Sequence, residues 1–160
     1  MIRFITLIPA ALMLLSSAAA AVEPHDDVPE EAREAVAAVD RFSAALSAGV
    51  VERAAAELHP QVIILESGGA ERSAAEYLGG HAKSDAEFLK TAEHKPGRRT
   101  ARASGDLVWV ASESEFVIQK DGKPVAIAST ETMVLQSTAD GWRIVHIHWS
   151  SHVRKSASAT

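Results

Sequence analysis

Apolar residues recur at helical spacing in the first part of the sequence after residue 28. A helix is expected to follow Pro29 and to end at Gly49. Intervals of four, three and four residues separate the members of its apolar face, which are Ala35, Val39, Phe42 and Leu46. A second, shorter helix is predicted over residues 51–58, and Pro60 ends it.

Two further elements are predicted before residue 99. The β-branched run VIILE at 62–66 is bounded by Pro60 and a Gly-Gly pair, which indicates a buried strand. Ser73 and Glu76 have the spacing of a capping box, so a new helix is expected to begin there. Gly79 and Gly80 weaken that helix by about 1 kcal/mol each relative to alanine, which makes them the place where it would break.

The hydrophobic period changes to two in the second half of the chain. Four strands are predicted, over residues 99–103, 107–119, 125–137 and 142–150. Asp-Gly pairs at 121–122 and 140–141 separate the last three strands and indicate tight hairpins. Long antiparallel strands after a helical half predict an α+β domain with helices on one face of a curved sheet.

The last predicted strand is apolar on both of its expected faces. Strict alternation assigns Trp142, Ile144, His146, His148 and Ser150 to one face, and the intervening residues, Trp149 among them, to the other. A sheet with one solvated face normally shows polar residues there. A homodimer contact through the sheet is therefore expected, and Trp149→Ala is expected to dissociate or unfold such a dimer.

Length, charge and cysteine content exclude several classes of protein. The 160 residues fit one domain, and the net charge of −5 without a long basic run excludes a nucleic-acid-binding surface. The chain has no cysteine, which excludes disulfides, thiol nucleophiles and cysteine-ligated metals. A small acidic globular domain is the class that remains.

The two ends of the chain carry signals of export and of disorder. Residues 1–21 combine Arg3, an apolar run and a series of alanines, which is the pattern of a cleaved secretory signal peptide. Residues 22–28 are expected to be flexible, 29–152 to form the domain, and 153–160 to be a disordered tail. The mature protein is expected to be periplasmic or secreted, with no membrane association after cleavage.

Two segments resemble a known family. The ending GWRIVHIHWSS at 141–151 resembles the last strand of the SnoaL-like branch of the nuclear transport factor 2-like superfamily, and that of the calmodulin-dependent kinase II association domain. The segment 59–88 resembles exported bacterial members of unknown function. The resemblance implies a cone-shaped, curved antiparallel sheet wrapped around N-terminal helices, with one pocket between them. This fold serves cyclases, isomerases, dehydratases and binding modules alike.

Seven side chains are candidates for the chemistry of such a pocket. Acid–base roles are predicted for His81, Asp85 and His148. Ligand-binding roles are predicted for Glu66, Tyr77, Glu131 and His146. His81 and Asp85 are four residues apart on one helix face, whereas His146 and His148 are two apart on a strand, about 6.6 Å between their Cα atoms.

Three functions from different classes remain open on these residues. The first is the binding of a small molecule in the pocket without catalysis. The second is acid–base catalysis of the cyclase, isomerase or dehydratase type, in which Tyr77 could donate to an oxyanion. No cofactor is expected in either. The alternative is a periplasmic zinc or copper site formed by His81, His146, His148 and Glu66 or Asp85.

Overall fold

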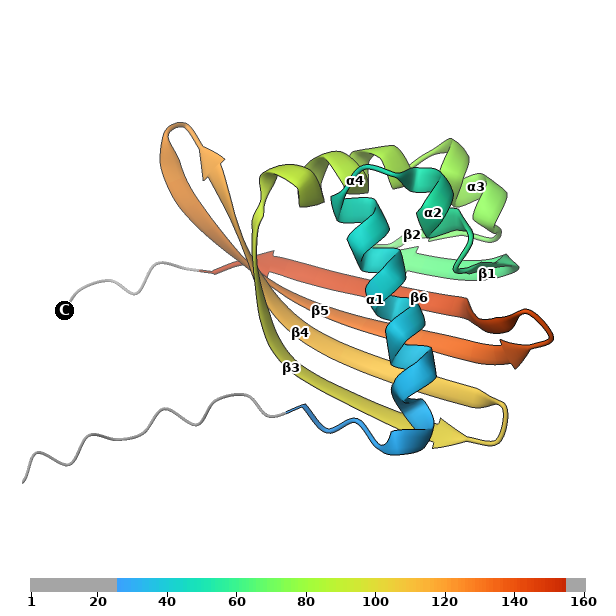
Figure 1. Cartoon of the computed structure of the whole chain (residues 1–160). Coiled ribbons are helices and arrows are strands. Elements are labelled where there is room, and N and C mark those ends of the chain that lie inside the picture. Colours follow the sequence, from blue (N-terminus) through green and yellow to red (C-terminus); the bar gives the residue numbers. More distant parts are fainter. Residues whose placement is uncertain (1–25, 155–160) are drawn as a thin grey trace, which may run out of the picture.

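A computed structural model of the chain describes residues 26–154 and has eleven elements in this part (Figure 1). The helical elements are a 3-10 turn η1 (Glu30–Ala32), α1 (Arg33–Ser47), α2 (Val51–Ala55), α3 (Ala74–Gly79) and α4 (Ala82–Thr91). The strands are β1 (Leu58–Glu66), β2 (Gly69–Glu71), β3 (Glu93–Ser104), β4 (Leu107–Lys120), β5 (Lys123–Thr138) and β6 (Gly141–Val153).

The six strands form one curled sheet that does not close. Their order is β2-β1-β6-β5-β4-β3, with β1 parallel to β6 and the other neighbours antiparallel. Helix α1 crosses the concave face of this sheet, and α2, α3 and α4 lie along one side of it (Figure 1). The expected α+β architecture, a curved sheet around N-terminal helices, is confirmed.

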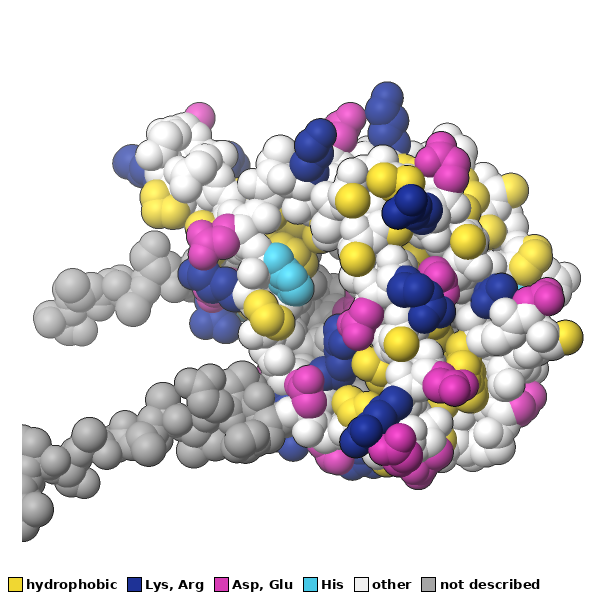
Figure 2. Space-filling model, viewed as in Figure 1, with side chains coloured by type: hydrophobic (Ala, Val, Ile, Leu, Met, Phe, Trp, Pro, Cys, Tyr) yellow, Lys and Arg dark blue, Asp and Glu magenta, His cyan; other side chains and the backbone are white. Residues whose placement is uncertain are grey.

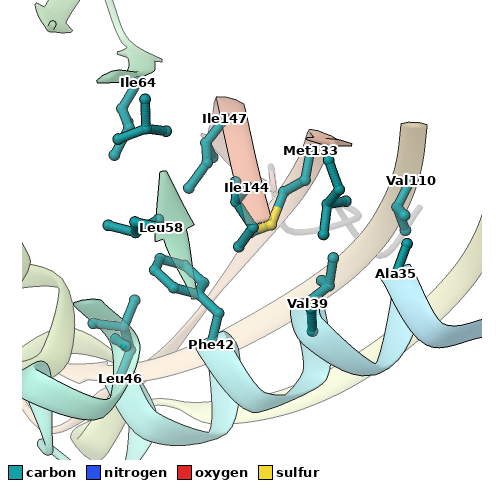
Figure 3. Close-up of a cluster of buried hydrophobic side chains, with 14 of the residues drawn as sticks. Ala35, Val39, Phe42, Leu46, Leu58, Ile64, Val110, Met133, Ile144 and Ile147 are labelled. Atoms are coloured by element: carbon teal, nitrogen blue, oxygen red, sulfur yellow. The ribbon is translucent and has the colours of Figure 1, made fainter. Parts of the chain in front are cut away.

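The core forms where α1 packs on the concave face. The predicted apolar face of α1 points at the sheet, and Val39 and Phe42 are almost completely buried there (Figure 3). The opposing side chains come from five strands that lie side by side, and they form one row in register. From β1 to β3 the row consists of Ile64, Ile147, Met133, Val110 and Ala101, all buried.

Several element boundaries differ from those predicted. The second helix ends at Ala55 instead of reaching 58, because Leu58 begins β1 and pairs with Ile144 of β6. Pro60 therefore lies inside β1, next to the irregular register between Leu58 and Ile63, where a missing N–H is tolerated. The hydrophobic pattern did not predict the short strand β2 or the first half of β3.

The helix after Ser73 begins and breaks where the sequence indicates. The Ser73 hydroxyl accepts a hydrogen bond from the Glu76 backbone N–H at 3.1 Å, as in a capping box. Gly79 is the last residue of α3, and Gly80 follows with a non-helical backbone before α4 begins. The break separates Tyr77 on α3 from Asp85 on α4, so the two side chains come from different helices.

A bulge in β6 overturns the predicted assignment of its faces. Ile144 pairs with Leu135 and His146 pairs with Val134, so one extra residue lies between them, and both Ile144 and Ile147 point into the core. The alternation is therefore shifted by one residue after the bulge. Trp149 therefore lies on the concave face and packs on Phe42 of α1. The expected dimer contact through this side chain is wrong, because α1 already covers it.

The first described residues pair with the edge strand. The Asp27 N–H donates to the Arg99 carbonyl at 2.8 Å, and the Ala101 N–H donates to the Asp27 carbonyl at 2.9 Å. Asp27, within the segment 22–28 that was expected to be flexible, thus forms a bridge with β3, and β6 continues to Val153, one residue past the expected end of the domain. The predicted signal peptide and residues 155–160 lie outside the described residues. Within 26–154, no helix is long and apolar enough to cross a membrane.

Candidate functional site

A row of polar side chains crosses the concave face next to the core row. On every strand it lies two residues from the core row, so it faces the same side of the sheet. From β1 to β3 the row consists of Glu66, Trp149, Glu131, Ser112 and Arg99, each paired in register with the next. This row marks the place where the hydrophobic core ends and a cavity begins.

The cavity has a volume of about 430 Å³ and lies between α1, α4 and the concave face. Its apolar lining is contributed by Phe42, Leu46, Phe88, Leu89, Phe116 and Trp149. Beyond the polar row, the sheet carries three serines in register, Ser114, Ser129 and Ser151, whose small side chains leave the space open. Figure 2 shows a hollow with acidic and basic side chains around its rim. Such a volume and lining are typical of small-molecule sites.

Glu131 lies at the middle of the polar row. Its Oε2 accepts a hydrogen bond from the Trp149 indole N–H at 2.8 Å, and its in-register neighbour Ser112 lies on the other side. Burial raises the pKa of this carboxyl, and the hydrogen bond from Trp149 opposes that shift only in part. Glu131 was predicted as a ligand-binding residue, and the structure places it in the cavity lining.

Glu66 and Asp85 line the cavity from β1 and α4. Burial raises the pKa of both carboxyls, and the charge of Asp85 raises that of Glu66 further. The Tyr77 hydroxyl donates to Asp85 Oδ2 at 2.9 Å. Burial, together with the neighbouring charge of Asp85, raises the pKa of Tyr77. Both carboxyls were predicted from the sequence, and they lie at the same part of the cavity.

Tyr77 and His81 belong to the surroundings of the cavity rather than to its lining. Tyr77 is completely buried, packs against Trp149 with 6.1 Å between ring centroids, and directs its hydroxyl to Asp85. The Tyr77 hydroxyl, for which donation to an oxyanion was expected, thus donates to Asp85, and Tyr77 is not among the lining residues of the cavity. The His81 ring pairs with the buried Glu71, and most of the His81 side chain is exposed.

His146 and His148 lie on the convex face, away from the cavity. The His146 Nδ1 lies 2.9 Å from the Ile63 carbonyl, and His148 is exposed. These two rings are thus separated by the sheet from Glu66, and the alternative metal site is not assembled. In the part of the chain from 26 to 154, no three His, Asp or Glu side chains are placed to hold a metal ion.

Sequence reasoning missed the residues at the mouth of the cavity. The Arg99 guanidinium donates to Asp40 on α1 at 2.6 Å and to the Ser112 hydroxyl at 3.2 Å, so it joins the helix to the sheet. His94 stacks on Phe116 with 4.9 Å between ring centroids. Desolvation, aided by the charge of Arg99, lowers the pKa of His94. The missed signal was the continuation of β3 before residue 99, which aligns these side chains with β4.

The curled sheet, the helices on its concave face and the enclosed cavity define the nuclear transport factor 2-like class of α+β proteins. The model of the SnoaL-like domain family matches residues 35–154. The chain belongs to this SnoaL-like family. No curated protein sequence matches it significantly.

Several solved structures are similar to this chain. A candidate ketosteroid isomerase from Shewanella frigidimarina is 35% identical, with a TM-score of 0.67, and the match covers 71% of this chain and 92% of that one. A candidate calcium/calmodulin-dependent protein kinase II association domain from Xanthomonas campestris is 22% identical, with a TM-score of 0.64 and coverage of 82% and 98%. A candidate dehydratase of the same superfamily from Streptomyces avermitilis is 16% identical, with a TM-score of 0.62 and coverage of 76% and 96%. The last two show the fold alone.

Proposed function

We propose that this SnoaL-like domain binds a small, largely apolar molecule in the cavity on its concave face. The observation that carries the proposal is the abrupt change along β4, β5 and β6 from core side chains to the polar row and then to small serines. A strand used only for packing would continue its apolar residues under α1. The cavity of about 430 Å³ is large enough for a molecule of modest size.

Filling the cavity tests this proposal directly. Ser129→Leu places a bulky side chain on the floor between Ser114 and Ser151, whereas Thr130→Leu places the same side chain one residue along, on the exposed face. Both proteins and the wild type are purified natively, denatured, and their extracts are compared by mass spectrometry. A small molecule present with wild type and Thr130→Leu but lost with Ser129→Leu supports the proposal. Equal extracts from all three would contradict it.

Acid–base catalysis is a second candidate, favoured by the carboxyl groups in the cavity and by the 35% identity to a candidate ketosteroid isomerase. Asp85 would accept and return the proton, because burial raises its pKa toward the range useful for proton transfer. Tyr77 would position that carboxyl through its 2.9 Å hydrogen bond. His81 would act only through the charge that it contributes beside Asp85.

A β,γ-unsaturated ketosteroid provides the test of this second candidate. Transfer of one proton moves the double bond into conjugation with the ketone, and ultraviolet absorbance follows the product. Asp85→Asn is expected to abolish the rate, whereas Glu87→Gln, on the exposed side of the same helix, is expected to retain it. Absence of any rate above the background with wild-type protein would contradict ketosteroid isomerisation.

A second copy of the chain is the proposed partner of the convex face. One row there, in register from β1 to β4, consists of Ile63, His146, Val134 and Trp109. Ile63 and Trp109, at the two ends of this row, are large apolar side chains and are 46% and 40% exposed. Similarity to an association domain favours an oligomer. Light scattering should show that Trp109→Glu is a monomer. The control Gln119→Glu, at the tip of β4, should remain a dimer. If both variants are dimers, this face is excluded as the dimer contact.

Export and independence from metal complete the proposal. When the full chain is expressed in a bacterium with a periplasm, it should be recovered from the periplasmic fraction with an N-terminus after residue 21, and recovery only from the cytoplasm with Met1 intact would contradict export. Binding should survive treatment with EDTA, because the four ligands suggested for a metal are divided between the two faces of the sheet. Loss of binding that zinc restores would contradict this part.

A further inference from the structure

The charged groups of the cavity are unequal in number. Three carboxyl side chains line its inner part, those of Glu66, Asp85 and Glu131, whereas the exposed Asp40 lies with the guanidinium of Arg99 at the mouth. Asp26, Arg98 and Glu113 are exposed at the rim. Because Arg99 is paired with Asp40 at 2.6 Å, its charge is compensated at the mouth. Three carboxyl groups remain further inside with no cationic side chain paired to them in the described part of the chain.

The hydrogen-bond donors near these carboxyl groups are already engaged. The Trp149 indole N–H is directed to Glu131, and the Tyr77 hydroxyl is directed to Asp85. Neither donor is left for a ligand. Glu66 accepts no side-chain hydrogen bond and forms no ion pair with any residue in 26–154. The protein therefore presents acceptors at Glu66 and Asp85, and the side chains of the lining that remain as donors are the serines of the sheet and α1, His94, Arg98 and Arg99.

The imidazole of His81 is directed away from the cavity. His81 is paired with Glu71 outside the lining, so it neutralises a carboxylate that does not reach the cavity. Burial disfavours the ionised forms of Glu66 and Asp85 more strongly than the nearby charge of His81 favours them, so the pKa values of both carboxyls are raised. A cation placed between these two carboxyl groups would remove that penalty.

The apolar walls fit the remainder of such a cation. The Trp149 ring stacks on Phe42 with 6.4 Å between centroids, and both line the cavity next to Glu66. Aromatic faces attract ammonium groups and also cover apolar carbon. Phe88 and Phe116, in edge-to-face contact at 5.4 Å, form the wall toward the mouth.

We propose that the ligand of this cavity carries a basic nitrogen, which binds as a cation between Glu66 and Asp85 while its apolar part lies against Phe42, Phe88 and Trp149. This inference rests on the proposed binding function and names the class of ligand. It differs from the binding of a ketone or another neutral acceptor, for which the carboxyl groups would have to remain protonated and donate.

The two classes of ligand respond in opposite directions to pH. An alkylamine stays protonated up to about pH 10. Its affinity rises with pH as Glu66 and Asp85 lose their protons, and binding below their raised pKa values releases protons to the solvent. The binding of a neutral ligand held by protonated carboxyl groups weakens as pH rises. The sign of the pH dependence therefore separates a cation from an acceptor.

Isothermal titration of the full mature chain with three matched compounds tests the inference. The probes are 2-naphthylethylamine, 2-naphthylethanol and 2-naphthylacetate, which share a ring system and differ in charge. The amine is expected to bind at least tenfold more tightly than the alcohol at pH 7.5, and the carboxylate least tightly. Glu66→Gln should weaken the amine about tenfold and leave the alcohol within about twofold. The matched exposed variant Glu87→Gln should change neither.

The outcomes separate failure of this inference from failure of the proposed function. Equal or tighter binding of the alcohol, an amine affinity that falls as pH rises, or an amine affinity unchanged in Glu66→Gln would each overturn the basic nitrogen while leaving a binding cavity. Binding of none of the three compounds, with Ser129→Leu losing no co-purified molecule, would overturn both.

Discussion

The indole N–H of Trp149 donates to Glu131 Oε2 at 2.8 Å, from β6 to the adjacent residue on β5. This contact joins the aromatic wall of the cavity to its central carboxyl. Trp149 also packs on Phe42 and Tyr77, so one side chain connects α1, α3 and the sheet. The orientation of Glu131 therefore depends on the packing of two helices.

Trp149→Phe should destabilise the fold by about 1–3 kcal/mol, because the partly buried carboxyl loses its donor while an aromatic ring is retained. Urea unfolding followed by circular dichroism measures the change. Trp142→Phe is the matched control on the same strand, since no side-chain hydrogen bond of the Trp142 indole is found within residues 26–154. Equal losses in the two variants would show that the hydrogen bond has no specific contribution.

Glu131→Gln should become more stable relative to wild type as pH rises from 4 to 8. Burial raises the pKa of Glu131 above its ordinary value of 4.5, so its stabilising contribution is complete below that value and is lost as pH rises through the folded-state pKa. Glutamine retains an oxygen for Trp149 and does not ionise. The difference in unfolding free energy between the two proteins, measured at pH 4, 6 and 8, tests the sign.

Asp27→Asn supplies a control of opposite sign for this pH dependence. The hydrogen bond from Arg102 lowers the pKa of Asp27 below its ordinary value of 3.8, so its contribution is present above that value and is lost as pH falls through the folded-state pKa. The variant should therefore lose stability relative to wild type at high pH. The same slope in both variants would contradict the assigned environments.

Ile147→Ala and His148→Ala should differ sharply although they are neighbours. The bulge in β6 turns Ile147 into the core, where truncation costs about 2–5 kcal/mol. His148 is exposed on the convex face, and its truncation should stay within about 0.5 kcal/mol in the monomer. Chemical denaturation compares the two. A larger loss for His148 would mean that the register of β6 is not the one described.

Gly97→Ala should destabilise the protein by about 1–3 kcal/mol. A Cβ at this position would lie 2.8 Å from the backbone oxygen of Glu113, at the irregular pairing of β3 with β4. Gly79→Ala should have the opposite effect, because a Cβ added there, at the end of α3, would have no atom within 4 Å. The free energy of unfolding is expected to rise by about 0.5–1 kcal/mol. Thermal unfolding of both variants is the measurement, and a stabilised Gly97→Ala would contradict the close approach.

Much of the fold could be predicted because it depends on local periodicity. The spacing from Ala35 to Leu46 is buried on α1 as predicted, and the Asp-Gly pairs lie at the β4–β5 and β5–β6 turns. The capping box begins α3 at Ala74, and the glycine pair ends it. These features are encoded within a few residues, so no knowledge of distant contacts was needed.

The candidate site could be predicted only where a residue's face follows from simple alternation. Glu66 and Glu131 reach the cavity because β1 near its end and β5 near its middle alternate regularly. The prediction that His146 and His148 line the cavity fails because one inserted residue in β6 reverses the faces of the residues that follow it. Since the period of a strand is two, a single bulge transfers every later side chain to the opposite side.

The sequence by itself determined the class of fold, the start and break of the third helix, and the strands that make up most of the sheet. Only the tertiary structure decided that Arg99, Ser112, Glu131, Trp149 and Glu66 lie in one row across five strands. The reason is physical: hydrophobic period and capping are local properties, whereas strand register and bulges are set by packing between distant segments, as between Ile63 and His146, which are 83 residues apart. The cavity and its excess of carboxyl groups arise at that second level.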